Sequence, residues 1–234
     1  MLNRLVAAFV LISVLGSVPL LAQENRRPLV LNGHGEVKMA PDMAIVDLGV
    51  ESQGPTAKAA LEANTRNMAT LMAMLKSANI EDKDIQTSNF SVQPRYDDKP
   101  NVNQPKIVGY AVNNAVSVAV RKLDGLGVLL DKAVGSGSNQ ISSIGFTVAA
   151  PQEAQDEARR AAVKDALRKA SVLTDAAGVK LGALRSMSEQ GGGQIMPMAK
   201  MSRMAAAPMQ AQAVPVAEGQ VSITADVNMV WEMQ

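Results

Sequence analysis

Methionines are the side chains of this sequence with the clearest capacity for chemistry. A thioether sulfur is readily oxidised to the sulfoxide and is a ligand that suits the soft ion Cu(I). Five candidates for contact with a soft metal or an oxidant lie in one stretch: Met196, Met198, Met201, Met204 and Met209. The surrounding residues, 191–219, are rich in Gly, Ala, Pro and Gln and lack periodicity, which predicts a flexible loop. This loop is either a reactive site or a low-complexity segment that tolerates methionine.

His34 is the single histidine, and the chain has no cysteine. A histidine can serve as a general base or a metal ligand, but no second histidine or cysteine is present to complete such a site. We therefore interpret His34 as a strand or rim residue. The flanking glycines, Gly33 and Gly35, lack the third glycine and the following helix of a dinucleotide fingerprint. They indicate a bulge or a close packing contact.

Acidic side chains form two short clusters that offer paired carboxylates. The clusters are Glu81, Asp82 and Asp84, followed by Asp97 and Asp98. Their spacing is not that of an EF-hand loop, and acids are common in turns. Three serines, Ser136, Ser138 and Ser188, have no neighbouring base or nucleophile elbow. We therefore expect no catalytic residue, no cofactor and no firm metal site, with an envelope hydrolase that uses an acid pair as one alternative.

The composition is that of a globular chain. Of its 234 residues, 47% are hydrophobic and 19% are charged, which is typical of neither a disordered chain nor a membrane bundle. Lys and Arg number 23 against 22 Asp and Glu, and aromatic residues make up 3%. A neutral chain with few stacking side chains is a poor partner for nucleic acid. Without cysteine, core packing alone must hold the fold.

The N-terminus has the layout of a secretory signal peptide. A short basic start is followed by an apolar run that Gly16 and Pro19 interrupt, and polar residues begin after Ala22. This layout predicts cleavage after Ala22, while an uncleaved anchor is the alternative because the run is close to the length that spans a bilayer. We expect 1–22 to be the signal peptide and 23–234 to form one exported domain without a transmembrane segment.

Hydrophobic periodicity predicts an α+β fold. Strands are expected at 30–38, 43–52, 85–96, 108–121, 141–149, 180–189 and 220–233, and helices at 56–78, 123–134 and 151–177. From 43 to 149 the order is strand, helix, strand, strand, helix, strand, which is the split βαβ (ferredoxin-like) unit with both helices on one side of an antiparallel sheet. The turn at Pro41 and Asp42 suits a hairpin between the first two strands. Asn79 is a plausible left-handed helix stop.

Two faces in this scheme consist of small residues. The long helix in the C-terminal half carries the stripe Ala154, Ala158, Ala162, Ala166, Ala170, Leu173 and Ala177, so it can lie close to its neighbour. One face of the strand at 108–121 carries Ala111, Asn113, Ala115, Ser117 and Ala119. This flat face contributes little apolar burial, so we expect a closely packed helix or a second subunit on it.

An ordered series of short motifs gives the chain a family resemblance. The motifs are Gly33-His34-Gly35-Glu36-Val37 with Pro41-Asp42, Asp84-Ile85-Gln86-Thr87 through Pro94 and Tyr96, Gly109-Tyr110 with Asn114, Leu123 through Leu126-Gly127 to Leu130-Asp131, Ala158-Arg159, Asp165-Ala166, Lys169-Ala170, and Ala176-Ala177-Gly178-Val179-Lys180-Leu181-Gly182 closing at Ser188-Glu189. Over residues 29–233 the chain resembles the SIMPL-domain family, close to its periplasmic immunogenic and oxidative-stress-defence members. It departs from the family pattern at Asn79, where glycine is usual, and at Met187, where isoleucine is usual.

The resemblance implies a function that no residue pattern above reveals. It implies a periplasmic or outer-membrane-associated protein of a Gram-negative bacterium that is not an enzyme, contributes to oxidative-stress tolerance, is antigenic and forms homo-oligomers. Envelope proteins are its implied partners, and no catalytic residue is carried over. Three hypotheses follow: a self-assembling structural or interaction protein, a copper-binding or oxidant-scavenging module based on the methionine loop, and an envelope hydrolase.

Overall fold

The computed structural model describes residues 27–97, 105–198 and 214–234. Over these residues the chain is α+β. Its elements are β1 (Arg27–Met39), β2 (Met43–Gly54), α1 (Ala57–Ser77), the short 3-10 helix η1 (Asp82–Asp84), β3 (Ile85–Tyr96), β4 (Ile107–Val120), the 3-10 helix η2 (Leu123–Gly125), α2 (Leu126–Gly135), β5 (Gln140–Thr147), α3 (Gln152–Ala177), β6 (Leu181–Met198) and β7 (Gln220–Met233). The expected signal peptide, 1–22, lies outside the described residues.

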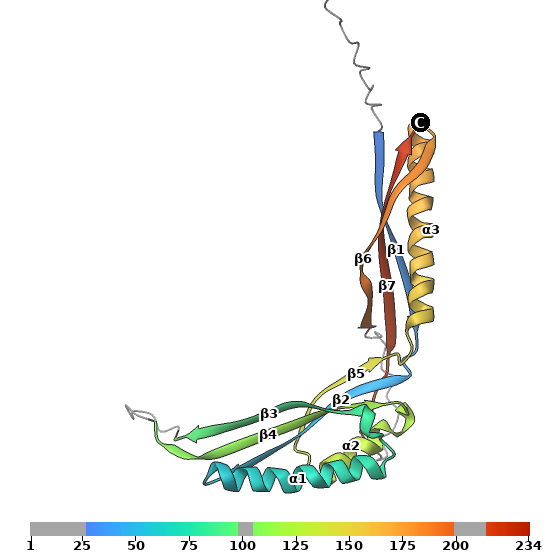
Figure 1. Cartoon of the computed structure of the whole chain (residues 1–234). Coiled ribbons are helices and arrows are strands. Elements are labelled where there is room, and N and C mark those ends of the chain that lie inside the picture. The colour runs from blue at the N-terminus through green and yellow to red at the C-terminus, as the bar shows by residue number, and fades with distance from the viewer. Residues whose placement is uncertain (1–26, 98–104, 199–213) are drawn as a thin grey trace, which may run out of the picture.

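The strands form two separate antiparallel sheets that make two arms of an L (Figure 1). One arm holds the four-stranded sheet β3-β4-β2-β5 with α1 and α2, and the other holds the three-stranded sheet β1-β7-β6 with α3. The order β3-β4-β2-β5, with every neighbour antiparallel, confirms the predicted split βαβ unit.

The predicted hairpin between the first two strands is wrong. β1 pairs along its length with β7, whereas β2 pairs with β4 and β5, so the segment at Pro41 is the corner between the arms. Asp42 holds this corner, because its backbone N–H donates to Thr147 O at 3.2 Å and its carboxylate accepts from the N–H of Ala149 at 2.7 Å. Turn-forming residues suit a hairpin and a corner equally well, and only the distant partner strand distinguishes them.

Each arm has its own hydrophobic core. In the four-stranded arm, buried Val and Leu side chains of β2 and β4 pack against Leu71 and Leu75 of α1 and Leu126 and Leu130 of α2. Both helices therefore cover the same face of this sheet, as the split βαβ order predicts. The cap at Thr56, whose hydroxyl accepts from the N–H of Ala59, starts α1 where the sequence predicts.

In the three-stranded arm, α3 packs through its alanine stripe. Ala158, Ala162, Ala166 and Ala170 are fully buried against the core residues of β7, which include Ile223, Met229 and Trp231. At the end of the stripe, buried Thr174 takes the place expected of Leu173, which is 48% exposed. The four-residue step from Ala170 leads to Thr174, so the predicted stripe is correct as far as Ala170 and wrong at Leu173.

The first described part of the expected loop is a strand. β6 continues to Met198, so Met196 and Met198 lie on β6, while Met201, Met204 and Met209 lie outside the described residues. The register between β6 and β7 shifts between Gln190 and Gln194, where three consecutive glycines disturb the pairing. Because the pairing is irregular here, the sequence lacks the alternation of apolar and polar residues that predicts a strand.

Candidate functional site

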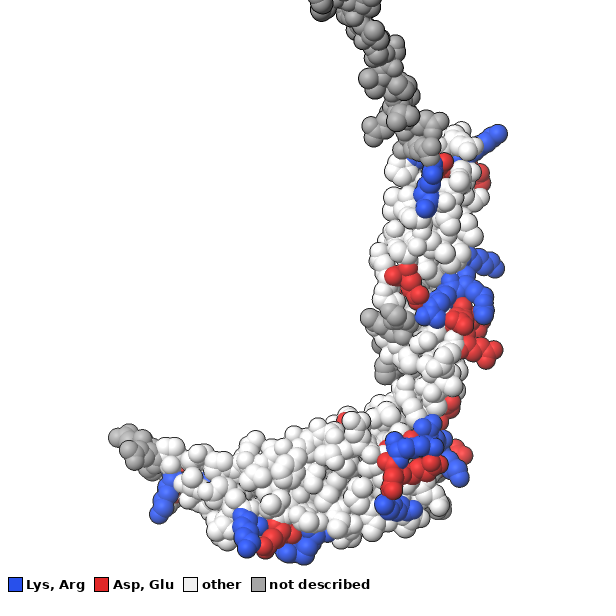
Figure 2. Space-filling model, viewed as in Figure 1, with Lys and Arg blue, Asp and Glu red and all other residues white. Residues whose placement is uncertain are grey.

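The face of the four-stranded sheet opposite α1 and α2 is not covered by any described helix. Figure 1 shows the helix layers on the outside of the L and the open faces of both sheets on its inside. Charged side chains gather mainly on the outer side of both arms, and few lie inside the angle (Figure 2). We call the uncovered side of the four-stranded sheet the open face. The predicted row of small residues, from Ala111 to Ala119 on β4, lies at its centre and is partly exposed.

Polar side chains of all four strands form a connected network on the open face. Asn89 donates to Asn113 Oδ1 at 3.4 Å, and Asn113 donates to Gln140 Oε1 at 2.6 Å. Gln140 in turn donates to Glu51 Oε2 at 3.1 Å. Gln53 donates to Glu51 Oε1 at 3.1 Å and accepts from Arg95 of β3. The network fixes the orientation of these side chains across the sheet.

Gly49 allows this network to cross β2. Gly49 lies between Ala115 of β4 and Gln140 of β5 in the register. A Cβ at Gly49 would lie 3.2 Å from Gln140 Oε1 and 3.3 Å from the Cβ of Ala115. Since glycine has no side chain, Gln140 passes over β2 and reaches Asn113 on the strand beyond.

The outer strand of the same sheet carries exposed apolar side chains. β3 is an edge strand, and Phe90, Val92 and Tyr96 on it are 54%, 41% and 48% exposed. Val92 is opposite buried Val112 and so shares the helix-bearing face, but α1 packs mainly on β2 and β4 and only partly on β3, which leaves Val92 exposed. Such a strand offers unpaired backbone groups and apolar area together.

His34 lies on the other arm, as a rim residue. Its Nδ1 is 2.8 Å from Asp226 Oδ1, and both side chains are about half exposed, at 54% and 52%. An aspartate–histidine pair is part of a catalytic triad, but the described hydrogen bonds of His34 include no serine or threonine hydroxyl. The structure thus places His34 on an exposed strand, as the sequence predicts, and both of its described side-chain partners are aspartates.

Polar groups of α3 close the outer edge of β1 near His34. Asp165 Oδ2 accepts from the backbone N–H of His34 at 3.1 Å, and Lys169 Nζ donates to the carbonyl of Asn32 at 2.9 Å. Lys169 and Arg168 also contact Asp165, at 2.6 and 2.8 Å. Hydrogen bonds from Lys169, Arg168 and the His34 N–H hold the pKa of Asp165 far below its usual value.

Each acid of the first predicted cluster has its own cation. Asp82 pairs with Lys76 at 3.0 Å, Glu81 with Lys83 at 2.7 Å and Asp84 with Arg121 at 2.8 Å. No group of three metal-ligating side chains occurs in 27–97, 105–198 and 214–234. In the second cluster, Asp97 closes the β3–β4 hairpin through its N–H, and Asp98 lies outside the described residues.

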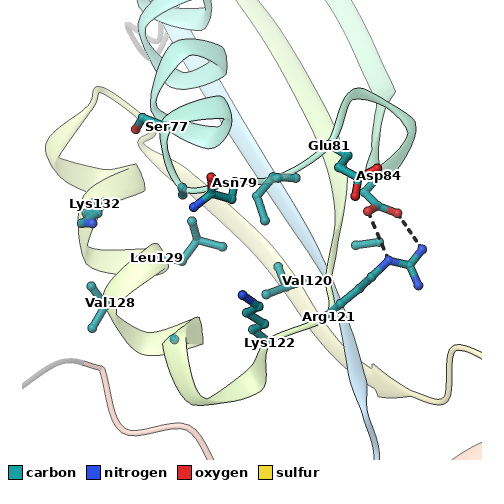
Figure 3. Close-up of a pocket in the computed structure, with 14 residues that line it drawn as sticks. Ser77, Asn79, Glu81, Asp84, Val120, Arg121, Lys122, Val128, Leu129 and Lys132 are labelled. Carbon is teal, nitrogen blue, oxygen red and sulfur yellow. Dashed lines mark hydrogen bonds and ion pairs between the residues drawn. The ribbon is translucent and has the colours of Figure 1, made fainter.

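Glu81 and Asp84 line a pocket of about 670 Å³, which bears on the hydrolase hypothesis (Figure 3). A glycosidase needs one carboxylic acid with a raised pKa to protonate the leaving group. The hydrogen bond from Arg121 instead lowers the pKa of Asp84. Glu81 is exposed and paired with Lys83. Asp84 is therefore held as a carboxylate and is poorly suited to protonate a leaving group.

The serine candidates occupy structural positions, and Met196 lies exposed on a strand. Ser138 is buried and donates to the carbonyls of Gly49 and Gln140, at 3.0 and 3.2 Å. Ser136 ends α2, and Ser188 lies on β6 opposite Asn228. Met196 is 50% exposed on β6, opposite Ser222. The network of the open face was missed from sequence, because its members lie on four strands and no local spacing joins them.

Comparison with known proteins places this architecture in a family. The family profile described as SIMPL, protein of unknown function (DUF541), matches residues 29–231. The 26 kDa periplasmic immunogenic protein of Brucella melitensis is 38% identical over 246 aligned residues, covering 99% of this chain and 98% of the relative, and the protein of the same name from Brucella abortus is equally similar. The uncharacterized protein YggE of Escherichia coli K12 is 32% identical, covering 86% of this chain and 83% of the relative. The chain belongs to the SIMPL family.

Proposed function

We propose that this chain is a periplasmic structural or interaction protein, without enzymatic activity, that works by assembling with copies of itself. The observation that carries the proposal is the edge strand β3, whose exposed Phe90 and Val92 lie at the margin of a sheet with an uncovered face. An unpaired strand with apolar side chains is the surface that a second sheet or a second copy covers.

The location rests on the N-terminus and on the relatives. Residues 1–22 have the layout of a signal peptide, and the Brucella relatives carry the word periplasmic in their names. Within the described ranges, no helix combines the length and the apolar character needed to cross a bilayer. Outer-membrane association, antigenicity and a part in oxidative-stress tolerance are predictions from the family resemblance and follow from no single residue.

Burial energy favours an assembly built on β3. Covering an exposed large apolar side chain contributes roughly 1.5–3 kcal/mol, and Phe90, Val92 and Tyr96 lie on one strand, with Ile107 and Val108 on the neighbouring strand β4. The open face adds a flat surface of small side chains whose polar groups the network already orients. Because α1 and α2 cover the other face of the sheet, we propose that a second subunit covers the open face.

Assembly is tested by light scattering coupled to size-exclusion chromatography on the mature protein and two variants. Val92→Lys places a charge on the apolar edge, and Val172→Lys is the matched control, because Val172 is 57% exposed on α3 of the other arm. We expect an oligomer for the wild type and the control and a smaller species for Val92→Lys. A monomeric wild type at tens of micromolar protein, or a Val92→Lys variant that assembles like the control, contradicts the proposal.

A second candidate function is soft-metal binding or oxidant scavenging. The observation that favours it is the exposure of Met196 on β6, at 50%, within the methionine-rich stretch. Titration of the mature protein with Cu(I), and mass spectrometry after peroxide treatment, test it. Copper binding predicts a saturable titration that Met196→Leu weakens. Oxidant scavenging predicts that Met196 forms the sulfoxide faster than buried Met229 and faster than Met187, whose exposure is similar. Equal oxidation of Met196 and Met187, together with no copper binding, excludes it.

A further inference from the structure

The pocket in the four-stranded arm combines an apolar wall with Lys122 and Lys132, which form no ion pair with any described residue (Figure 3). It opens between the end of α1, the 3-10 helix η1, the end of β4 and α2. Asn79 shapes the upper wall, because its left-handed φ of 60° turns the chain sharply after α1. The N–H of Ile80 then bonds back to Leu75 O at 3.1 Å, which fixes Ile80 at the rim.

The wall of the pocket is apolar. Val120 and Leu129 are 3% and 6% exposed and form its inner part, while Ile80 and Val128 lie nearer the opening. A volume of about 670 Å³ is within the range of small-molecule sites, which are mostly apolar with a few placed polar groups. The pocket is therefore suited to the apolar part of a small ligand.

The charges around the pocket do not cancel locally. Arg121 holds Asp84 through two contacts, Nε to Oδ2 at 3.2 Å and Nη2 to Oδ1 at 2.8 Å, and the Asp84 side chain is only 9% exposed. Glu81 is neutralised by Lys83. Lys122 and Lys132 also line the pocket, and neither forms an ion pair within the described part of the chain. Figure 3 shows the Lys122 side chain extending into the hollow.

We infer that this pocket binds a small amphipathic monocarboxylate, with its aliphatic tail against Val120, Val128 and Leu129 and its head group at Lys122 and Lys132. Charge complementarity selects the anion, because both acids of the pocket are paired, whereas Lys122 and Lys132 have no acidic partner among the described residues. The apolar wall selects a ligand with an apolar tail over a fully polar anion. This inference concerns the pocket alone and stands apart from assembly through β3.

Isothermal titration of the mature protein with a series of carboxylates tests the inference. Hexanoate, octanoate and decanoate should bind saturably, with affinity rising roughly fourfold for each buried methylene, whereas acetate and neutral decanol should bind much more weakly. Chemical-shift changes at the methyl groups of Ile80 and Val128 should accompany binding and locate it in the pocket. Decanol binding as tightly as decanoate, or shifts confined to the other arm, overturns the inference.

Anionic vesicles separate a free carboxylate from a membrane head group. We expect that phosphatidylglycerol vesicles do not retain the protein. If the vesicles retain the wild type but not the Lys122→Ala variant, the pocket binds lipid head groups and the small-ligand inference is overturned. In solution, Lys122→Ala and Lys132→Ala should each weaken decanoate binding roughly tenfold, the effect of losing one charge-assisted hydrogen bond. Lys58 is exposed on α1 and does not line the pocket, so Lys58→Ala should leave decanoate binding unchanged. Equal binding by all three variants contradicts the site.

Discussion

Gly35 of β1 lies directly against Ala158 of α3, so closely that a Cβ at Gly35 would overlap the Ala158 carbonyl oxygen. Gly33 makes the same contact with Ala162 one turn further along the helix. The two glycines and the alanine stripe thus set the separation of helix and strand in the three-stranded arm. The sequence predicts a bulge or a close packing contact at these glycines, and the structure shows the close packing contact.

Replacing Gly35 with alanine should destabilise the protein. Added volume in a packed contact forces backbone shifts that typically cost about 1–3 kcal/mol, and here the obstacle is backbone. We expect a loss near the upper end of that range in urea unfolding followed by circular dichroism. Gly145→Ala on β5 is the matched control, because the nearest atom to its added Cβ is 4.0 Å away. Equal stability of the two variants would show that helix and strand separate freely.

Asp165 should make stability depend on acid. The pKa of Asp165 is lowered in the folded protein, first by the hydrogen bond from Lys169 and then by Arg168 and the His34 N–H. Its contribution is therefore present above the unfolded-state pKa of about 4 and is lost as pH falls through the folded pKa. We expect Asp165→Asn to be less stable than wild type at neutral pH and the difference to shrink in acid. Urea titrations at several pH values measure it, and a constant difference would contradict the assignment.

How far the sequence predicts the fold depends on the range of the interactions. The split βαβ unit follows from local apolar periodicity, which a strand such as β4 shows plainly because one of its faces is buried. The partner of β1 is β7, close to the other end of the chain, and no local pattern encodes that pairing. Local turn chemistry therefore predicts a hairpin at Asp42, where the structure has a corner.

The candidate site was predictable only in part. The small residues of β4 are visible in the sequence, but their face is partly exposed and carries no described helix, so the expected second subunit stays a prediction. The polar network depends on Gln140 crossing above Gly49, which joins three strands through the register. The pocket likewise depends on Lys122 and Lys132 lying beside the end of α1, a tertiary arrangement.

Glycine at position 79 should preserve stability, whereas alanine should lower it. Its φ of 60° is in the left-handed region, which glycine enters freely and which asparagine tolerates better than other residues. We expect Asn79→Gly to be neutral or slightly stabilising and Asn79→Ala to cost about 1 kcal/mol. Thermal unfolding of both variants against wild type checks the order. Alanine as stable as glycine at this position would contradict the left-handed turn.

Asn64 should be the most sensitive polar position of the four-stranded core. It is 1% exposed on α1, and its Nδ2 donates to the carbonyls of Val50 at 2.6 Å and Val112 at 3.2 Å, so it ties the helix to β2 and β4. Asn64→Leu removes the amide group that donates to both carbonyl oxygens. The loss of these two hydrogen bonds should lower the free energy of unfolding by about 1–3 kcal/mol. Asn64→Asp should cost more at neutral pH, because a buried carboxylate would face two carbonyl oxygens. Urea unfolding should rank wild type, then leucine, then aspartate, and an aspartate variant equal to wild type would show that this position is hydrated.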